Sequence, residues 1–326
     1  EGFTIDKTNN GQGRAFYINN SSSVNIKNID ITNREDFHNY NFTQGDYNPQ
    51  DGMYIYIDGS NVSFEGLSIS DVKMWQITER FGIIHIDNSS VLFNDLYMAD
   101  IISGSKDNRV SNNSGNCIWM EFNSNVEINN SYFQNSQIYS YDAESGGVIF
   151  IYSEQDESYS NSLTINNTDF INNGINTDDN SEFGGVIYSQ KYNDVIINNS
   201  NFDANFAGPD GSGGAIYTES NNNLEIHNST FINHMSDGTQ TGNNGNNDNT
   251  KYTADGGVIY SGSNSNVLIS GCTFDNNSSQ SRGGTLYINE NSNTIIENSI
   301  INNSTTYYAD GGAIYQQNSS TLDISE

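Results

Sequence analysis

The chain has 326 residues with 40 acidic and 11 basic side chains, a formal net charge of -29 and a hydrophobic content of only 34%. Such a negative surface argues against nucleic acid and anionic membranes as partners, and leaves cations, basic proteins and neutral glycans open. No apolar run approaches the roughly 18 residues that a membrane-spanning helix needs, so we expect no membrane insertion in this segment.

Short apolar segments with period-two alternation recur along the first 145 residues, at 16–31, 54–69, 83–98 and 117–133. They are rich in Val, Ile, Tyr and Phe, which is typical of β-strands, and no stretch keeps the 3.6-residue period of a helix. We interpret these segments as four degenerate repeats. A polar insertion separates the first from the second.

The repeat becomes regular from Gly146 onward. Each unit begins with two glycines, followed by a small residue, Ile or Leu and an aromatic residue, and the glycine pairs start at 146, 184, 213, 256, 283 and 311. Short strands repeated every roughly 27 to 40 residues are typical of a solenoid. The sequence therefore predicts an all-β fold, a single-stranded right-handed parallel β-helix of roughly ten coils, the last incomplete.

We expect one continuous domain over 1–326, with degenerate coils at 1–145 and regular Gly-Gly-x-Ile-Tyr coils at 146–326. A solenoid needs polar caps, and this sequence starts and stops in mid-pattern, so we expect it to be part of a longer chain. The two cysteines, Cys117 and Cys272, fall several coils apart. We predict that they are buried thiols, because a disulfide cannot span that distance.

Equivalent positions predict columns of side chains that repeat from coil to coil. We expect three columns to point inward: Ile149, Ile187, Ile216, Ile259, Leu286 and Ile314; Ile128, Ile165, Ile197, Ile226, Ile269 and Ile296; and Phe133, Phe170, Phe202, Phe231, Phe274 and Ile301. An outward aromatic ladder should comprise Tyr188, Tyr217, Tyr260, Tyr287 and Tyr315. Asn tolerates the left-handed backbone of a corner, and Gly adopts it freely. We therefore expect corners at the Gly-Gly pairs and at Asn130, Asn167, Asn199, Asn228, Gly271 and Asn298.

Insertions of variable length fall between each Phe segment and the next glycine pair, near 33–51, 101–115, 135–145, 172–183, 204–212, 233–255, 275–282 and 303–310. They should therefore all leave the solenoid on one side. In repeat proteins that side is often the binding face, although surface loops also drift without a function.

Two short motifs recur in the regular coils: GGAI at Gly213 and Gly311 or GGVI at Gly146, Gly184 and Gly256, and FxxN at Phe170, Phe202 and Phe274. Both resemble the chlamydial polymorphic outer-membrane protein repeat, in the wider group of right-handed parallel β-helix proteins related to pectate lyases. The resemblance covers about 146–326, and Ser136 and His234 stand where the motif has Asn. It implies a β-helix and, in the chlamydial family, a surface-exposed passenger domain. It says little about function, because such repeats serve adhesins, surface proteins and secreted proteins alike.

Asn-x-Ser/Thr sequons are frequent, and some would carry N-linked glycans in a chain that passes through a eukaryotic secretory pathway. A composition rich in Asn and Ser also generates sequons by chance. The candidate acceptors are Asn41, Asn61, Asn88, Asn112, Asn129, Asn166, Asn198, Asn228, Asn276, Asn302 and Asn318. Asn129, Asn166 and Asn198 are equivalent, so we expect them to face solvent on successive coils.

The remaining candidate sites are less specific. The tyrosine ladder could stack on sugar rings or on a neighbouring molecule, or it could brace the coils. Calcium is a possible cofactor, with solvated loop charge as the alternative. The acidic clusters concerned are Asp156 with Glu157, Asp178 with Asp179 and Glu182, and Asp248 with Asp255. The sequence assigns no catalytic residue and no metal ligand.

A polysaccharide lyase or hydrolase would need carboxylate-bound calcium with a base, or paired Asp residues. The stretch Asn176–Asp179 superficially resembles part of the polygalacturonase signature, but that family's Gly-His-Gly and Arg-Ile-Lys elements are missing. The basic residues Arg80, Arg109, Lys191 and Arg282 fall in separate coils, and His38, His85, His227 and His234 have no visible partner set. We therefore do not expect an enzyme.

These observations favour a structural or adhesive β-helix that is extracellular or on the cell surface, N-glycosylated, and able to assemble end to end into a filament. Its partners would be further copies of itself, other surface proteins or glycans. One alternative is a glycan-binding adhesin with its ligand on the insertion face. The other is a pectate-lyase-like polysaccharide lyase or hydrolase.

Overall fold

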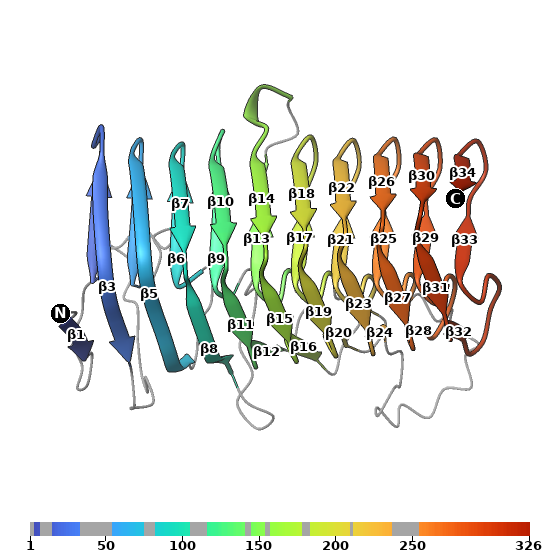
Figure 1. Ribbon diagram of the computed structural model, residues 1–326, viewed down its shortest axis with the longest axis horizontal. Helices are drawn as coiled ribbons and strands as arrows, with labels where there is room; N and C mark the ends of the chain where they lie inside the picture. Colours follow the sequence, from blue (N-terminus) through green and yellow to red (C-terminus); the bar gives the residue numbers. More distant parts are fainter. Residues whose placement is uncertain are drawn as a thin grey trace.

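The computed structural model describes residues 3–6, 15–32, 54–74, 82–104, 116–140, 145–153, 157–177, 183–208, 211–236 and 254–326. In these ranges the chain forms parallel β-strands and one short 3-10 helix, η1 (Glu157–Tyr159). Strands of successive coils stand side by side along the long axis, and the two termini lie at opposite ends (Figure 1). The protein is a parallel β-helix, as the repeat pattern predicted.

One sheet has ten strands, and we call it the Gly-Gly column because most of its strands follow a glycine pair. Its strands pair in sequence order, one from each coil, which confirms the predicted ten coils within the described residues. They are β2 (Phe16–Asn19), β4 (Ile55–Asp58), β6 (Ile84–Asp87), β9 (Ile118–Glu121), β13 (Ile149–Ile151), β17 (Ile187–Ser189), β21 (Ile216–Thr218), β25 (Ile259–Ser261), β29 (Leu286–Ile288) and β33 (Ile314–Gln316).

Within the described residues, the second sheet has 24 strands arranged in three columns. The Ile column contains β3 (Val24–Thr32), β5 (Asn61–Met74), β7 (Ser90–Asn94), β10 (Asn125–Asn129), β14 (Ser162–Asn166), β18 (Asp194–Asn198), β22 (Asn223–His227), β26 (Asn266–Ser270), β30 (Asn293–Glu297) and β34 (Thr321–Ser325). The Phe column contains β1 (Phe3–Asp6), β8 (Tyr97–Ser103), β11 (Tyr132–Gln134), β15 (Asp169–Ile171), β19 (Asn201–Asp203), β23 (Thr230–Ile232), β27 (Thr273–Asp275) and β31 (Ile300–Asn302). The short column contains β12 (Gln137–Ser140), β16 (Gly174–Thr177), β20 (Phe206–Ala207), β24 (Met235–Ser236), β28 (Ser278–Ser279) and β32 (Thr305–Thr306).

The three predicted inward columns form the hydrophobic core. Phe170, Phe202 and Phe231 pair directly from coil to coil, and their side chains are fully buried. Their rings stack with centroids 4.7 and 4.6 Å apart. The two Ile columns are buried in the same way apart from Ile314, and Ile301 at the end of the Phe column is also partly exposed. Both the register and the inward direction are therefore confirmed.

Both kinds of predicted corner have the expected backbone. The corner residues from Asn130 to Asn298 all have positive φ, between 48° and 68°, and so does the first glycine of each pair, for example Gly184 at 69°. The second glycine is needed for a different reason. A Cβ on Gly185 would lie 2.2 Å from the carbonyl oxygen of Gly214 in the next coil, so no side chain fits there.

The sequence pattern did not predict the short column. Residues 135–145, 172–183 and the later insertions begin with a second left-handed corner, for example Asn172 with φ 54°, and continue into one of these strands. The insertions therefore begin later than predicted, after the strand of the short column. η1 lies in the connection from β13 to β14, where no insertion was predicted. The pattern missed the short column because strands of two to four residues show too little alternation.

A buried polar ladder follows the Phe column and explains the FxxN motif. The Oδ1 atom of Asn205 accepts the backbone N–H of Asn173 one coil earlier, at 2.9 Å, and its Nδ2 donates to the carbonyl of Phe170, at 2.8 Å. Asn277 repeats both contacts, with His234 and with Phe231. Each motif Asn thus satisfies backbone groups of the preceding coil that the core would otherwise leave without a partner.

Replacing Phe202 by Ala should lower the free energy of unfolding by about 3 to 5 kcal/mol, because it leaves a cavity between two stacked rings. Urea denaturation followed by circular dichroism measures the loss. Asn201→Ala is the matched control, since Asn201 is the half-buried outward neighbour on the same strand. Equal losses for the two variants would contradict the inward direction of the Phe column.

His234 replaces Asn in the ladder, and His234→Asn should stabilise the protein. Burial lowers the pKa of His234 from 6.5 to about 4, so the folded state binds this proton less readily than the unfolded state. Stability is then lost as the pH falls from about 6.5 towards 4. The Asn variant should gain about 1 kcal/mol at pH 7 from its amide bonds.

At pH 4.5 the gain of the Asn variant should be about 2 kcal/mol larger, because the amide does not titrate. Urea midpoints of both proteins at the two pH values measure this difference. A gain that does not grow on acidification would show that His234 is not held neutral.

Candidate functional site

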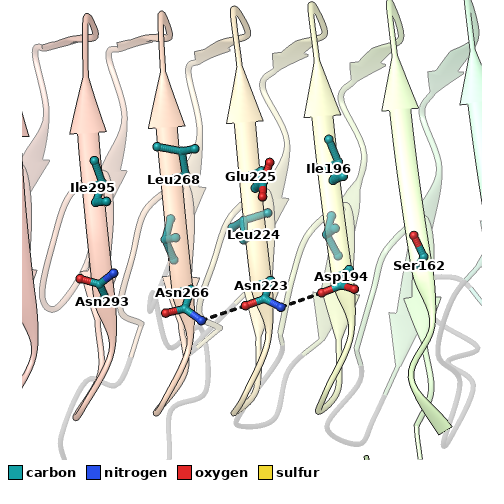
Figure 2. A pocket seen from close by; sticks show the side chains of 12 residues that line it. Ser162, Asp194, Ile196, Asn223, Leu224, Glu225, Asn266, Leu268, Asn293 and Ile295 are labelled. Atoms are coloured by element: carbon teal, nitrogen blue, oxygen red, sulfur yellow. Dashed lines mark hydrogen bonds between the residues drawn. The ribbon is translucent and has the colours of Figure 1, made fainter.

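A shallow groove of about 400 Å³ crosses the outer face of the Ile column. It runs over β14, β18, β22, β26 and β30, perpendicular to the strands, so each strand contributes equivalent positions (Figure 2). At about 4.8 Å per strand it spans roughly 19 Å. Its shape suits an extended ligand lying along the solenoid axis.

One edge of the groove is a row of polar side chains at the first position of each strand. The Nδ2 of Asn223 donates to Oδ1 of Asp194 at 2.7 Å, and the Nδ2 of Asn266 donates to Oδ1 of Asn223 at 2.9 Å (Figure 2). Each amide in this chain retains a second N–H and a second lone pair. The row therefore offers solvent both donors and acceptors once per coil.

Beside this row lies an aliphatic row interrupted by one carboxylate. Ile196, Leu268 and Ile295 are half-buried, and Glu225 stands between Ile196 and Leu268 (Figure 2). Glu225 also lies 3.5 Å from Nε2 of His227. None of the lining residues is Lys or Arg. Such a lining disfavours acidic polysaccharides and suits a neutral ligand with hydroxyl groups and apolar faces.

The aromatic ladder on the outer face of the Gly-Gly column mainly braces the coils. Neighbouring rings stack along it, with Trp119 and Phe150 4.3 Å apart and Tyr217 and Tyr260 4.4 Å apart. Tyr188 and Tyr287 are only 6% and 2% exposed. Since most ring faces contact another ring, few remain for a sugar. The interpretation as an open stacking surface is therefore not supported for these coils.

The hydroxyl groups of the ladder are also engaged. Tyr188 donates to Glu219, and Asn289 donates to the hydroxyl of Tyr260 at 2.9 Å. Burial, followed by the charge of Glu219, raises the pKa of Tyr188 well above 10. The buried phenol of Tyr188 therefore stays neutral at ordinary pH.

Arg282 joins the ladder to the glycine corner. Its guanidinium donates twice to Asp255, at 3.1 and 2.6 Å, and lies over the rings of Tyr287 and Tyr315 at 4.9 and 5.1 Å. Both oxygens of Asp255, one of the calcium candidates, thus accept from a cation. Its suggested partner Asp248 lies outside the described residues. Sequence reasoning missed this pair because the two residues are 27 positions apart, each directly before a glycine pair.

The first coils carry a second group of titratable side chains. Asp58, Asp87 and Glu121 occupy the same position on three adjacent strands, and Nε2 of buried His85 lies 2.9 Å from Glu121. Burial, then Glu121 and Asp58, raises the pKa of Asp87 to about 6. Among the described residues no three His, Cys, Asp or Glu side chains converge well enough to hold a metal ion.

Most other candidate residues for calcium or catalysis cannot be placed. Asp156, Asp178, Asp179 and Glu182 lie outside the described residues, as do Arg80, Arg109 and His38. Calcium binding and the expected lack of catalysis stay predictions. Both cysteines are buried and unpaired, as expected, and burial raises the pKa of Cys117 to about 12. No helix in the described ranges combines the length and the hydropathy needed to cross a membrane.

The structure divides the candidate sequons into two kinds. Asn129, Asn166 and Asn198 end their strands and are half-buried rather than open to solvent, and the Nδ2 of each donates to the Asn one coil earlier, at 2.8 to 3.0 Å. Asn276 is exposed and makes a similar bond to Asn233. The side chains of Asn61, Asn88, Asn228, Asn302 and Asn318 are exposed, and Asn41 and Asn112 lie outside the described residues.

Comparison with known protein families finds one match, which lies in the regular coils. The family of the Chlamydia polymorphic membrane protein repeat matches residues 271–289, which span the corner at Gly271, β27, β28 and β29. This is one unit of the FxxN and Gly-Gly pattern, so the chain is a parallel β-helix that contains repeats like those of that family. No curated protein and no solved structure matches the chain significantly.

Replacing Asp87 by Asn should flatten the pH dependence of stability. The folded state holds this proton more tightly than the unfolded state, so stability falls as the pH rises from about 4 to 6. The variant should be more stable at pH 7, by about 1 kcal/mol once solvent screening of this half-exposed group is allowed for. Urea midpoints between pH 4 and 8 measure the effect, with the exposed Asp95→Asn as control. Equal pH profiles would refute the stacked-carboxylate interaction.

Proposed function

We propose that this chain is a structural or adhesive β-helix of the cell surface whose outer groove binds an extended neutral glycan. The observation that carries the proposal is the groove over β14 to β30, with its hydrogen-bonding row beside an aliphatic row. Sugars present hydroxyl groups next to apolar C–H faces, so such a lining complements them. The polar row repeats once per coil, which suits a polymer better than a compact ligand.

Surface location is supported by the matched repeat and by composition. The matched family is described as a membrane protein repeat of Chlamydia, and a net charge of -29 suits a highly solvated exterior. The continuous pairing along both sheets supports a stiff, elongated body of the kind that adhesins and structural surface proteins use. N-linked glycans are part of this proposal.

A purely structural role is the second candidate, and end-to-end assembly into a filament belongs to it. The observation in its favour is the register, because identical positions pair in every coil and another copy could continue the same pattern. Electron microscopy of concentrated protein would show filaments if this is correct, and dispersed particles if it is not. A lyase or hydrolase remains the third candidate, which incubation with acidic polysaccharides with and without calcium would detect.

A glycan array should show binding to neutral polysaccharides, at least tenfold weaker for the variant Leu268→Lys. The added side chain would fill the aliphatic row of the groove. Leu92→Lys is the matched control, because Leu92 is half-buried at the same strand position on β7, outside the groove. Binding that is unaffected by Leu268→Lys, or equal binding of acidic polysaccharides, would overturn the groove as the ligand site. If the protein binds no glycan at all, the purely structural role is the candidate that remains.

A further inference from the structure

The equivalent sequons at Asn129, Asn166 and Asn198 coincide with a structural corner. The first Asn ends the strand, the second takes the left-handed conformation at φ 48° to 51°, and Ser or Thr begins the Phe segment. Each hydroxyl donates to the carbonyl of the sequon Asn, as from Ser131 to Asn129 at 2.7 Å. The sequence Asn-Asn-Ser/Thr therefore fits the structure of this corner, whether or not a glycan is attached.

The hydroxyl of the corner sequon is also an acceptor inside the molecule. Ser131 is 5% exposed, and its Oγ accepts the backbone N–H of Leu96 at 3.1 Å. Thr168 does the same for Ser131, and Ser200 does the same for Thr168. The sequon Asn side chains above them form their own row at intervals of about 4.8 Å, which leaves no space for a sugar ring on each. A glycan in this row would lie against the stacked Asn side chains of the neighbouring coils.

Three other sequons have their Asn side chains outside this row. Asn61 opens β5, Asn88 lies in the turn before β7, and Asn228 lies at the corner after β22, all with exposed side chains. Within the described residues, their side-chain amides make no hydrogen bond. The sequon hydroxyls are outside the buried ladder too: Ser90 is exposed, and Ser63 and Thr230 are half-buried on outward positions.

We propose that Asn61, Asn88 and Asn228 are acceptors of N-linked glycans and that Asn129, Asn166 and Asn198 are structural and carry none in the folded protein. The transferase acts on the chain before it has folded. Selection therefore operates on the folded product, because a sugar on a corner Asn must fit against Asn side chains stacked at about 4.8 Å. The inference rests on the proposed function only in taking the chain to meet a eukaryotic secretory pathway.

The test is to secrete the chain from a eukaryotic host and to map its glycans. Enzymatic release in heavy-oxygen water converts each modified Asn into labelled Asp, which peptide mass spectrometry locates. We expect label at Asn61, Asn88 and Asn228 and less than a tenth of that occupancy at the three corner positions. Label at the corner row of folded protein, or none at the three open positions, would overturn the inference. Because the host secretes the chain in any case, this result depends neither on the protein's native location nor on whether the groove binds a glycan.

A matched pair of variants separates the two roles. Ser90→Ala removes the sequon of Asn88 and should lower the intact mass by one glycan while leaving the urea midpoint unchanged. Ser131→Ala removes the sequon of Asn129 and should leave the glycan mass unchanged while lowering the midpoint, because the N–H of Leu96 loses its acceptor. The opposite pattern in either variant would refute the assignment.

Discussion

Direct pairing of each strand with its equivalent in the next coil is the constraint on which the whole structure depends. Parallel pairing fixes the spacing at about 4.8 Å, so every side chain lies over the residue at the same position one coil earlier. The sequence must therefore repeat side chains that tolerate their own kind. Phe over Phe and Ile over Ile fill the core, as at Phe170 and Phe202. Asn over Asn forms amide chains, as at Asn166 and Asn198.

Charged residues are the ones that such stacking penalises. Identical charges one coil apart repel: burial, followed by the charges of Glu121 and Asp58, raises the pKa of Asp87. At another place, opposite charges lie one coil apart. Asp255 pairs with Arg282 in the following coil, where the guanidinium also covers two tyrosine rings. With a net charge of -29, most of the acidic residues must lie on loops or exposed positions, which is where composition alone would place them.

The features that the sequence predicted are those that repeat. The Ile and Phe columns, the Asn and Gly corners and the coil number follow from period and residue type, because burial and left-handed φ each admit few residues. The short column was missed because two residues such as Phe206 and Ala207 carry no period. The groove could not be foreseen either. The side chains that it presents to solvent are outward positions, and only their juxtaposition in space makes them a surface.

A regular solenoid also indicates where to look for function. Residues that support the fold must recur in each coil, so a residue that breaks its column without a structural gain is a candidate for another role. Glu225 interrupts an aliphatic row, and His85 interrupts an aromatic one. His234, in contrast, breaks the buried Asn ladder in a place that no ligand can reach, which makes it a loss of stability rather than a site. Exposure decides whether such a residue is a loss of stability or part of a site. Glu225 lies at the surface, inside the groove. It is therefore the departure from the repeat that is most able to select a ligand.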